Sequence, residues 1–452
     1  MLPYLDRQIP IVFLYNNIES FFEFLNRTEM SELPRHPYVP NRQYSKGDRG
    51  LLSLQDKKLV FVSAPVPHAD YLRDHLGYRN TRFAYPANPS PWLSLDILQE
   101  PPLLNRIVEY AGPARAVQLV AYATTPQFLL LVRALRNDWG LTVLLPESPL
   151  PGCEWIKEYI DTKAGYRSLA ARWLSDAEAL MPEGMACETM LQAAEAAHWF
   201  CARGKPCVIK TDGGESGMGQ HIIRPEADPS VEAVFQELQA DPYLHHDLII
   251  VEEYIDSANH FSPSLEVYVP PMGDGEPRIT YLSNQLFLGL SDFYGLLINK
   301  EQLQSKWYPA LAESGLTIAR KLQAMGYAGH FDIDTVVDDN DRVYLLELNS
   351  RRTAGTHVHE FASHFFGDNY LDEVALLSIN KMKTGPISRF EDLQAAIGDL
   401  LYPIAGQKRG IIFAVTSILA ASEFGCIIVA ASAAEALDLH QQLRDRFQPT
   451  VH

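Results

Sequence analysis

The chain has 452 residues, which is enough for roughly two to four domains. Its hydrophobic content of 47% and charged content of 21% are those of an ordinary globular protein. The formal net charge of -18 argues against nucleic acid as the main partner, because phosphate binding needs a basic face. A local basic pocket for a nucleotide is still compatible with this charge.

The five cysteines are scattered at 153, 187, 201, 207 and 426, without the spacing of a metal site or a redox motif. Such a sparse, odd set fits a reduced cytoplasm. The N-terminus has neither a basic segment nor an apolar core, so we expect no signal peptide. The apolar run Gly410–Ala421 is too short to span a membrane. We therefore expect a cytoplasmic protein without a membrane partner, and leave a homodimer open.

Strand-like and helix-like stretches alternate over residues 1–150. This rhythm predicts a Rossmann-like parallel sheet. No G-x-G-x-x-G motif occurs, so dinucleotide binding is not supported. We expect a loop over 32–49, strands at Ile11–Tyr15, Lys58–Ser63, Val117–Tyr122 and Leu141–Leu145, and helices at Ile18–Leu25, His68–Leu76 and Pro126–Asn137.

The stretch PESPLP at 146–151 has the composition of a linker. Beyond it, a glycine-rich loop, Gly213–Gly219, joins two expected strands and predicts a flap whose backbone N–H groups close over phosphates. The expected helices here are 163–180, Thr189–Arg203 and Val231–Gln239, and the expected strands are Pro206–Lys210, Gln220–Arg224, Leu248–Glu252, Ser264–Val269 and Arg278–Ser283.

A long amphipathic helix is expected within Gln302–Met325. The last 70 residues predict a small α/β unit, with helices at Arg389–Leu400 and Ala433–Phe447 and strands at Ile411–Val415 and Cys426–Ala430. We therefore expect three domains with the bounds 1–150, 151–380 and 381–452.

The most informative stretch is a predicted β-hairpin, with apolar runs Phe331–Val337 and Arg342–Leu348 around four polar residues. Side chains alternate along a strand, so Glu347 and Asn349 share a face, which Asp334 can reach if the strands pair symmetrically. Three hard oxygen ligands would then suit Mg²⁺. A merely solvated hairpin explains the acidic turn but not Glu347 and Asn349, which interrupt an apolar strand.

Four features follow one another along residues 155–365: a lysine in DTKAGYR, a lysine before the glycine loop in KTDGGESGMG, the segment EEYI, and the hairpin acids in ELNSRRTAGTHVH. This order resembles the ATP-grasp superfamily of ATP-dependent carboxylate–amine ligases. The residues of these motifs look most like those of the pre-ATP-grasp peptide ligases of pheganomycin type. The resemblance implies a Rossmann-like pre-ATP-grasp domain, followed by two α+β subdomains that clamp ATP, with the lid at about 175–252, and a small C-terminal α/β extension.

The resemblance also implies a role for each matching residue. ATP phosphates would be contacted by Lys163, Lys210 and the loop glycines Gly213, Gly214, Gly217 and Gly219. The adenine edge would be read by the backbone of Glu252, Glu253, Tyr254 and Ile255, and ribose hydroxyls by Glu266. One or two Mg²⁺ ions would be bound by Asp334, Glu347 and Asn349. The catalytic residues would be Arg351, Arg352 and Lys210.

The sequence departs from D-alanine ligases at one position, because Asp332 stands where those enzymes carry an arginine. The resemblance then moves the oxyanion role to Arg351 or Arg352. Whether Asp332 joins the metal site stays open. His357 and His359 share a face if the chain there is extended, but two histidines without a third ligand favour packing or a substrate pocket.

The implied activity is ADP-forming ligation of amino-acid or peptide substrates through an acyl phosphate. The acceptor pocket would be built from the first domain, residues 284–300 and the loop 353–360. Two alternatives remain at this stage, a non-catalytic ATP-binding protein and a phosphotransferase to a non-carboxylate acceptor.

Overall fold

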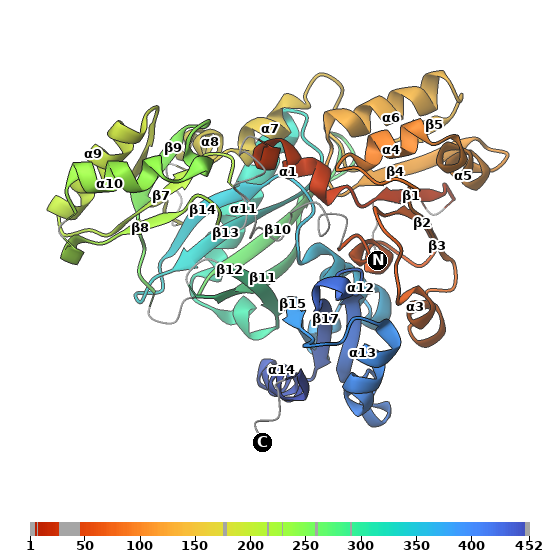
Figure 1. Cartoon of the computed structure of the whole chain (residues 1–452). Helices are drawn as coiled ribbons and strands as arrows, with labels where there is room; N and C mark the ends of the chain where they lie inside the picture. The colour runs from red at the N-terminus through yellow and green to blue at the C-terminus, as the bar shows by residue number, and fades with distance from the viewer. Residues whose placement is uncertain are drawn as a thin grey trace.

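The computed structural model describes residues 5–6, 8–26, 46–174, 179–214, 217–227, 229–257, 261–289 and 292–447. Three β-sheets organise this part of the chain (Figure 1). The first carries the N-terminal elements, the second carries residues 184–253, and the third carries the strands from 263 to 430. Residues 32–45 of the expected N-terminal loop and 175–178 of an expected helix lie outside the described residues.

The N-terminal sheet is entirely parallel and has the order β3-β2-β1-β4-β5, which confirms the Rossmann-like prediction. Its strands are β1 (Ile11–Leu14), β2 (Lys58–Phe61), β3 (Thr81–Ala84), β4 (Ala116–Ala121) and β5 (Thr142–Leu144). One face packs on three helices, α4 (Leu93–Gln99), α5 (Pro101–Ala111) and α6 (Pro126–Asn137). The other face, with Phe13 and Val60, joins the core of the C-terminal strands.

The second sheet has four antiparallel strands in the order β6-β9-β7-β8 and is covered by α9 (Met190–Ala202) and α10 (Val231–Gln239). Its strands are β6 (Gly184–Cys187), β7 (Cys207–Thr211), β8 (His221–Ile223) and β9 (Ile249–Glu253). Figure 1 shows this green unit standing away from the N-terminal sheet, across the central strands. It occupies the segment that we expected for the lid.

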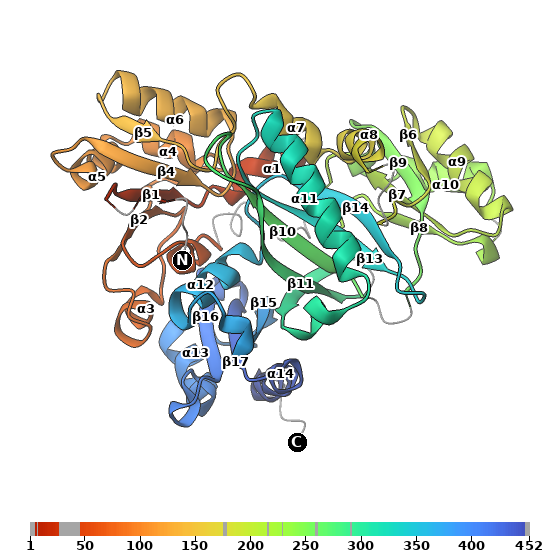
Figure 2. The same cartoon turned by 180° about the vertical axis from the view of Figure 1, so that it is seen from behind.

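The third sheet has eight strands in the order β14-β13-β10-β11-β12-β15-β17-β16. The strands are β10 (Pro263–Val269), β11 (Arg278–Leu288), β12 (Asp292–Ile298), β13 (Gly329–Val337), β14 (Val343–Asn349), β15 (Ala375–Lys383), β16 (Gly410–Val415) and β17 (Glu423–Ala430). Helix α11 (Tyr308–Ala324) lies across one face of it (Figure 2). That face carries apolar residues such as Leu265 and Ile333, which pack against Ile318 of the helix.

Several elements were not expected from the sequence, among them β3, α4, α5, β12 and β15. The expected linker 146–151 is also more than a connection, because Glu147 and Ser148 are buried. The expected C-terminal strands do form, but they continue the large sheet across residue 380 through pairs between β15 and β17. The division into three domains stays a prediction. Among the described residues, no helix combines the length and apolarity needed to cross a bilayer.

This continuity predicts that a chain ending after Lys383 will not fold properly. Truncation there would remove β16, β17 and α14 (Ala433–Phe447), and would leave β15 as an unpaired apolar edge beside an opened core. We expect an aggregating product without a cooperative urea transition, compared with a full-length control. A soluble, cooperatively unfolding fragment 1–383 would instead show that the C-terminal unit is independent.

Candidate active site

The predicted hairpin is present as β13 and β14, and Asp334 lies directly opposite Glu347. Near the turn the strands pair as Thr335 with Leu345, so the register shifts by one residue between the two pairs. Leu346 is therefore an extra residue in β14, a β-bulge. Without this bulge Asp334 would face Leu346, and Glu347 would point to the opposite side of the sheet.

One face of the large sheet carries polar residues that the cross-strand register aligns. Asp334 pairs with Glu347 on one side and with Ser264 on the other, and Ser264 pairs with Ser283 of β11. Directly paired residues point to the same face. The alternate residues Leu265 and Ile333 face α11, so the same alternation that builds the core presents the carboxylates to the open side.

A cavity of about 300 Å³ lies over this polar face. Its walls come from all three sheets, from residues Tyr15 and Tyr122 at the N-terminal sheet to Glu252 in the second sheet. The predicted site residues that line it are Lys210, Gly214, Gly217, Glu252, Glu253, Tyr254, Ile255, Asp334, Glu347, Asn349 and Arg351. Lining residues also come from the first domain, the 284–300 segment and the loop after Arg352, the three parts expected for an acceptor pocket.

The two aspartates of β13, Asp332 and Asp334, are placed where a cation would be favourable. Burial, together with the charge of Glu347, raises the pKa of Asp334 to about 7. Burial and the neighbouring Asp334 raise the pKa of Asp332 well above its usual range. One carboxylate oxygen of Asp332 is buried without a hydrogen-bond partner. These oxygens fit a hard cation such as Mg²⁺, which would relieve their mutual repulsion.

The donor set for a metal ion is nevertheless made of carboxylates and an amide. Among the described residues, no cluster of three or more His, Cys, Asp or Glu side chains is arranged to hold an ion. Asn349 supplies the third oxygen, and its amide nitrogen lies 3.2 Å from Asp334. Gln285 of β11 also donates to Asp334. The set Asp334, Glu347 and Asn349 therefore stays our proposal for the metal ligands.

Two buried lysines lie close enough to Glu347 of the hairpin to act on its charge. The ammonium of Lys163, at the start of α8 (Lys163–Trp173), lies 3.0 Å from Glu347 and 3.3 Å from the carbonyl of Gly214. Burial acts against ionisation of Glu347, but Lys163 and Lys210 outweigh it and lower the pKa of this carboxyl. Lys210 pairs with Glu252, whose other oxygen accepts a hydrogen bond of 2.8 Å from Arg167. Lys210 thus lines the cavity, whereas Lys163 contacts Glu347 without lining it.

The glycine loop is tied down at its first residues. Asp212 accepts a hydrogen bond of 2.7 Å from the N–H of Ala164, and Gly214 has no room for a side chain because a Cβ would lie 2.6 Å from Thr211. Gly217 and Gly219 have φ angles of 78° and 67°, which favour glycine. Glu215 and Ser216 lie outside the described residues.

The segment Glu252–Ile255 leaves the sheet at the cavity. The N–H groups of Glu253 and Tyr254 donate to the carbonyls of Glu183 and Pro206. Within the described structure, the N–H of Ile255 makes no backbone hydrogen bond, although Ile255 lines the cavity. This free donor is where an adenine edge would be read.

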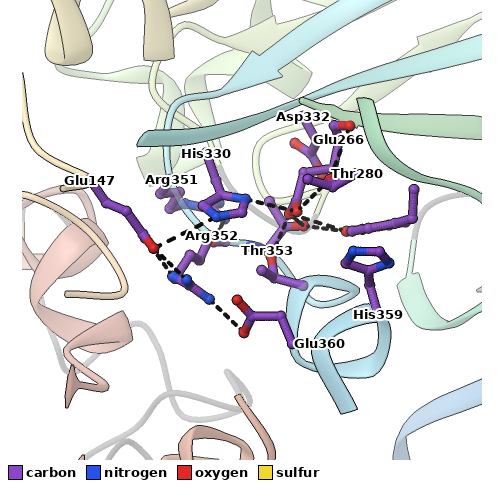
Figure 3. Close-up of polar contacts among 12 residues, drawn as sticks. Glu147, Glu266, Thr280, His330, Asp332, Arg351, Arg352, Thr353, His359 and Glu360 are labelled. Atoms are coloured by element: carbon purple, nitrogen blue, oxygen red, sulfur yellow. Dashed lines mark hydrogen bonds and ion pairs between the residues drawn. The ribbon is translucent and has the colours of Figure 1, made fainter. Parts of the chain in front are cut away.

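Arg351 and Arg352 point in different directions. The guanidinium of Arg351 lines the cavity, 3.0 Å from the amide oxygen of Asn349 and 3.4 Å from the hydroxyl of Tyr122. Arg352 is only 2% exposed, makes two hydrogen bonds of 2.8 and 2.7 Å to Glu147, and makes another of 2.8 Å to Glu360 (Figure 3). The geometry therefore favours Arg351 alone as the catalytic arginine and gives Arg352 a structural role.

Glu266 is also engaged in this buried cluster rather than in the cavity wall. Its carboxylate lies 3.0 Å from His330 Nδ1 and accepts hydrogen bonds from Thr280, Tyr281 and Thr356 (Figure 3). Burial would raise its pKa, but His330, Thr356 and Arg352 lower it overall. Glu266 has no exposed surface, so the geometry does not favour contact with a ribose.

His357 and His359, which would share a face in an extended chain, lie in the first turns of α12 (Thr356–Phe366). They therefore do not share a face. His357 is buried, and neither of its ring nitrogens has a hydrogen-bond partner. His359 lies 3.0 Å from the Tyr370 hydroxyl, and burial lowers its pKa to about 4. Neither lines the cavity, which favours packing.

Some cavity residues were not found from the sequence. Gln285 could have been found from the sequence. Ser283 and Gln285 are polar and two positions apart in one strand, so they lie on the same face. Tyr15 and Tyr122 follow parallel strands at the edge where ligands bind in open α/β sheets, which is a general signal for such residues. Arg49 belongs to the expected loop 32–49, and only the tertiary structure brings it to the cavity.

Comparisons with known proteins define the fold. No protein-family model matches the sequence, and no curated protein is a significant match. Among solved structures, biotin carboxylase from Campylobacter jejuni is similar with a TM-score of 0.58 and 15% identity, covering 97% of this chain and 92% of that one. The biotin carboxylase domain of 2-oxoglutarate carboxylase from Hydrogenobacter thermophilus has a TM-score of 0.56 and 13% identity, over 97% and 90% of the two chains.

N5-carboxyaminoimidazole synthetase from Staphylococcus aureus, in complex with ADP, has a TM-score of 0.53 and 12% identity over 98% of both chains. These are ATP-grasp structures, and the similarity extends over nearly the whole chain. The expected fold class is therefore confirmed: this chain has the ATP-grasp fold behind a Rossmann-like sheet.

The buried cluster around Arg352 predicts a large loss of stability for Arg352→Met. The substitution would leave Glu147 and Glu360 buried without their cation, which costs about 3–5 kcal/mol in comparable cases. Urea unfolding measures the change, with Arg106→Met on the exposed face of α5 as the control. A loss below about 1 kcal/mol, as for an exposed pair, would contradict the structural role of Arg352.

Proposed function

We propose that the protein is an ATP-dependent, ADP-forming carboxylate–amine ligase. The observation that carries this proposal is the placement of Asp334, Glu347 and Asn349 on one face of the bulged hairpin. That face opens to a cavity lined also by Lys210 and Arg351. Carboxylates for a metal ion, a lysine for phosphates and an arginine for a developing negative charge thus meet in one place.

The nucleotide would lie between the second sheet and the hairpin. Val208, Ile222 and Leu346 provide apolar wall there, and the free N–H of Ile255 would bind the adenine edge. The similarity to complexes with βγ-ATP, MgADP and ADP supports nucleotide binding by this chain. Lys210 and the loop glycines would contact phosphates, and Lys163 would do so after leaving Glu347.

A carboxylate is a poor electrophile because it would have to expel oxide. Transfer of the γ-phosphoryl group from ATP would convert one oxygen into a phosphate leaving group and release ADP. An amine would then attack the acyl phosphate, form the amide bond and release phosphate. When bound, Mg²⁺ would neutralise phosphate charge. Arg351, held by Asn349 and Tyr122, would stabilise the anionic oxygen of the tetrahedral intermediate.

The substrates that we propose are amino acids or peptides, on the basis of the motif resemblance to pheganomycin-type peptide ligases. The cavity adds support from the N-terminal sheet, where Tyr15, Tyr122 and Arg49 line its far part. An ADP-release screen over pairs of amino acids and peptides, with mass spectrometry of the products, tests the proposal. Amine-dependent ADP release with a new amide is expected. A phosphorylated product without an amide would identify a phosphotransferase, and nucleotide binding without turnover would identify a regulatory protein.

Glu347→Gln should reduce ATP turnover by at least two orders of magnitude, which corresponds to on the order of 3 kcal/mol of barrier. The substitution keeps the volume but removes a charged oxygen ligand from the proposed metal site. Steady-state ADP release at saturating Mg²⁺ is the measurement. Glu313→Gln, at an exposed position of α11, is the matched control and should turn over normally. Near-normal turnover in Glu347→Gln would contradict the assignment of Glu347 as a metal ligand.

ATP with Mg²⁺ should raise the melting temperature of the protein more than GTP does. The N–H of Ile255 is a donor, which suits N1 of adenine, whereas N1 of guanine carries a hydrogen. Thermal denaturation at equal nucleotide concentrations measures the difference, with Mg²⁺ alone as the control. Equal shifts with both nucleotides would remove the adenine assignment of Glu252–Ile255.

A further inference from the structure

Arg49 lies at the part of the cavity formed by the N-terminal sheet and β15. It belongs to α2 (Arg49–Leu52), is 6% exposed and lines the cavity together with Tyr15 and Asn380. One of its Nη atoms donates to the amide oxygen of Asn380, a residue of β15. Its guanidinium also interacts with the hydroxyl of Tyr15, where it opposes the rise of the tyrosine pKa that burial causes.

The backbone that carries Arg49 is held firmly. The carboxylate of Asp48 accepts hydrogen bonds of 2.7 and 3.0 Å from the N–H groups of Thr416 and Ser417, and one of 2.8 Å from the Ser417 hydroxyl. These residues directly follow β16. The C-terminal strands therefore fix the position of an N-terminal side chain in the cavity.

Within the part of the chain that the structure describes, the charge of Arg49 is not compensated. No carboxylate there is paired with its guanidinium, and its Nε is buried without a hydrogen-bond partner. His357, whose pKa is lowered by burial and by this cation, faces Arg49 as a neutral ring. A buried guanidinium without a counter-charge is costly to the fold, so such a group is expected where a ligand supplies the anion.

Arg49 and Arg351 both lie beside the tyrosine pair of the cavity wall. Arg49 interacts with the hydroxyl of Tyr15, and Arg351 lies 3.4 Å from the hydroxyl of Tyr122. The two tyrosine rings are 5.0 Å apart, and both arginines act on the Tyr15 hydroxyl. A ligand that lies between the two guanidinium groups is therefore of amino-acid or short-peptide size.

We propose that Arg49 binds the free carboxylate of an amino-acid or short-peptide substrate whose other end reacts beside Asp334 and Arg351. A guanidinium edge presents parallel N–H groups that match the two oxygens of a carboxylate. Tyr15 and Tyr122, whose rings lie 5.0 Å apart, form the wall between the two ends. The reaction of the bound ligand rests on the proposed function, whereas anion binding by Arg49 rests on the contacts of Arg49.

The first test needs no ligand. Arg49→Met removes a buried cation, and Asn380 and Tyr15 line the cavity, where water can replace the lost contact. We expect the melting temperature of the ligand-free protein to rise by a few degrees, and Arg49→Lys to show no such rise because it keeps the charge. A lower melting temperature or an unfolded protein in Arg49→Met would overturn the proposal, since Arg49 would then be a structural clamp.

The second test uses chosen probes on the full chain without nucleotide: trialanine, trialanine amide, succinate and inorganic phosphate. We expect trialanine and succinate at millimolar concentration to raise the melting temperature of the wild type and of Arg106→Met. Trialanine amide should shift it less, and Arg49→Met should lose these shifts. Equal shifts in wild type and Arg49→Met overturn the site, and an Arg49-dependent shift with phosphate alone overturns the carboxylate assignment.

The two proposals fail separately. If the probes bind through Arg49 but no amine-dependent ADP release is found, the anion site stands and the ligase does not. If amide formation is found and Arg49→Met changes neither KM for peptide substrates nor the preference for a free carboxylate, the ligase stands and the Arg49 site is refuted. For the supporting result, we expect KM to rise at least tenfold for free peptides and little for their amides.

Discussion

The structure depends on one constraint, the alternation of side chains across the strands β14, β13, β10 and β11, whose register shifts at bulges in the β13–β14 and β10–β11 pairs. The apolar half of the alternation packs on α11, and the polar half faces the cavity. A register error of one residue would exchange the two halves. The bulge at Leu346 keeps Glu347 and Asn349 on the polar face beside Asp334. If the pairing near the turn, Thr335 with Leu345, continued without a bulge, Glu347 would point to the opposite face. Core packing and the candidate site are thus products of the same register.

Around this sheet, buried charges join parts of the chain that are distant in sequence. Arg352 connects Glu147, which follows the N-terminal sheet, to Glu360 in α12, and His330 connects Glu147 with Glu266 (Figure 3). The charges of these groups are paired with one another, so they rigidify the support of the cavity. Arg351, one residue earlier, faces the opposite way and is held in the cavity wall. Arg352 is therefore buried in the support of the cavity, whereas its neighbour Arg351 lines the cavity.

The cavity also shows why the N-terminal sheet and the C-terminal strands belong to the same working unit. The parallel strands β1 and β4 deliver Tyr15 and Tyr122 at their carboxyl ends, and Asp48 links the segment of Arg49 to the end of β16. The nucleotide side is made of the second sheet and the hairpin, and the far side is made of these outer parts. Specificity for the second substrate would consequently depend on residues that the shared fold does not dictate.

The sequence alone predicted the parallel N-terminal sheet, the glycine loop between two strands and the carboxylate hairpin, because periodicity and turn residues are local signals. It did not predict β12, which forms a hairpin with the preceding β11, or β15, whose partners β12 and β17 are distant in sequence, so the C-terminal strands looked separate. It also could not distinguish Arg351 from Arg352, or remove Glu266 from the cavity. Burial, bulges and counter-charges decide those questions, and they exist only when remote residues such as Glu147, His330 and Asn380 have been brought together by the fold.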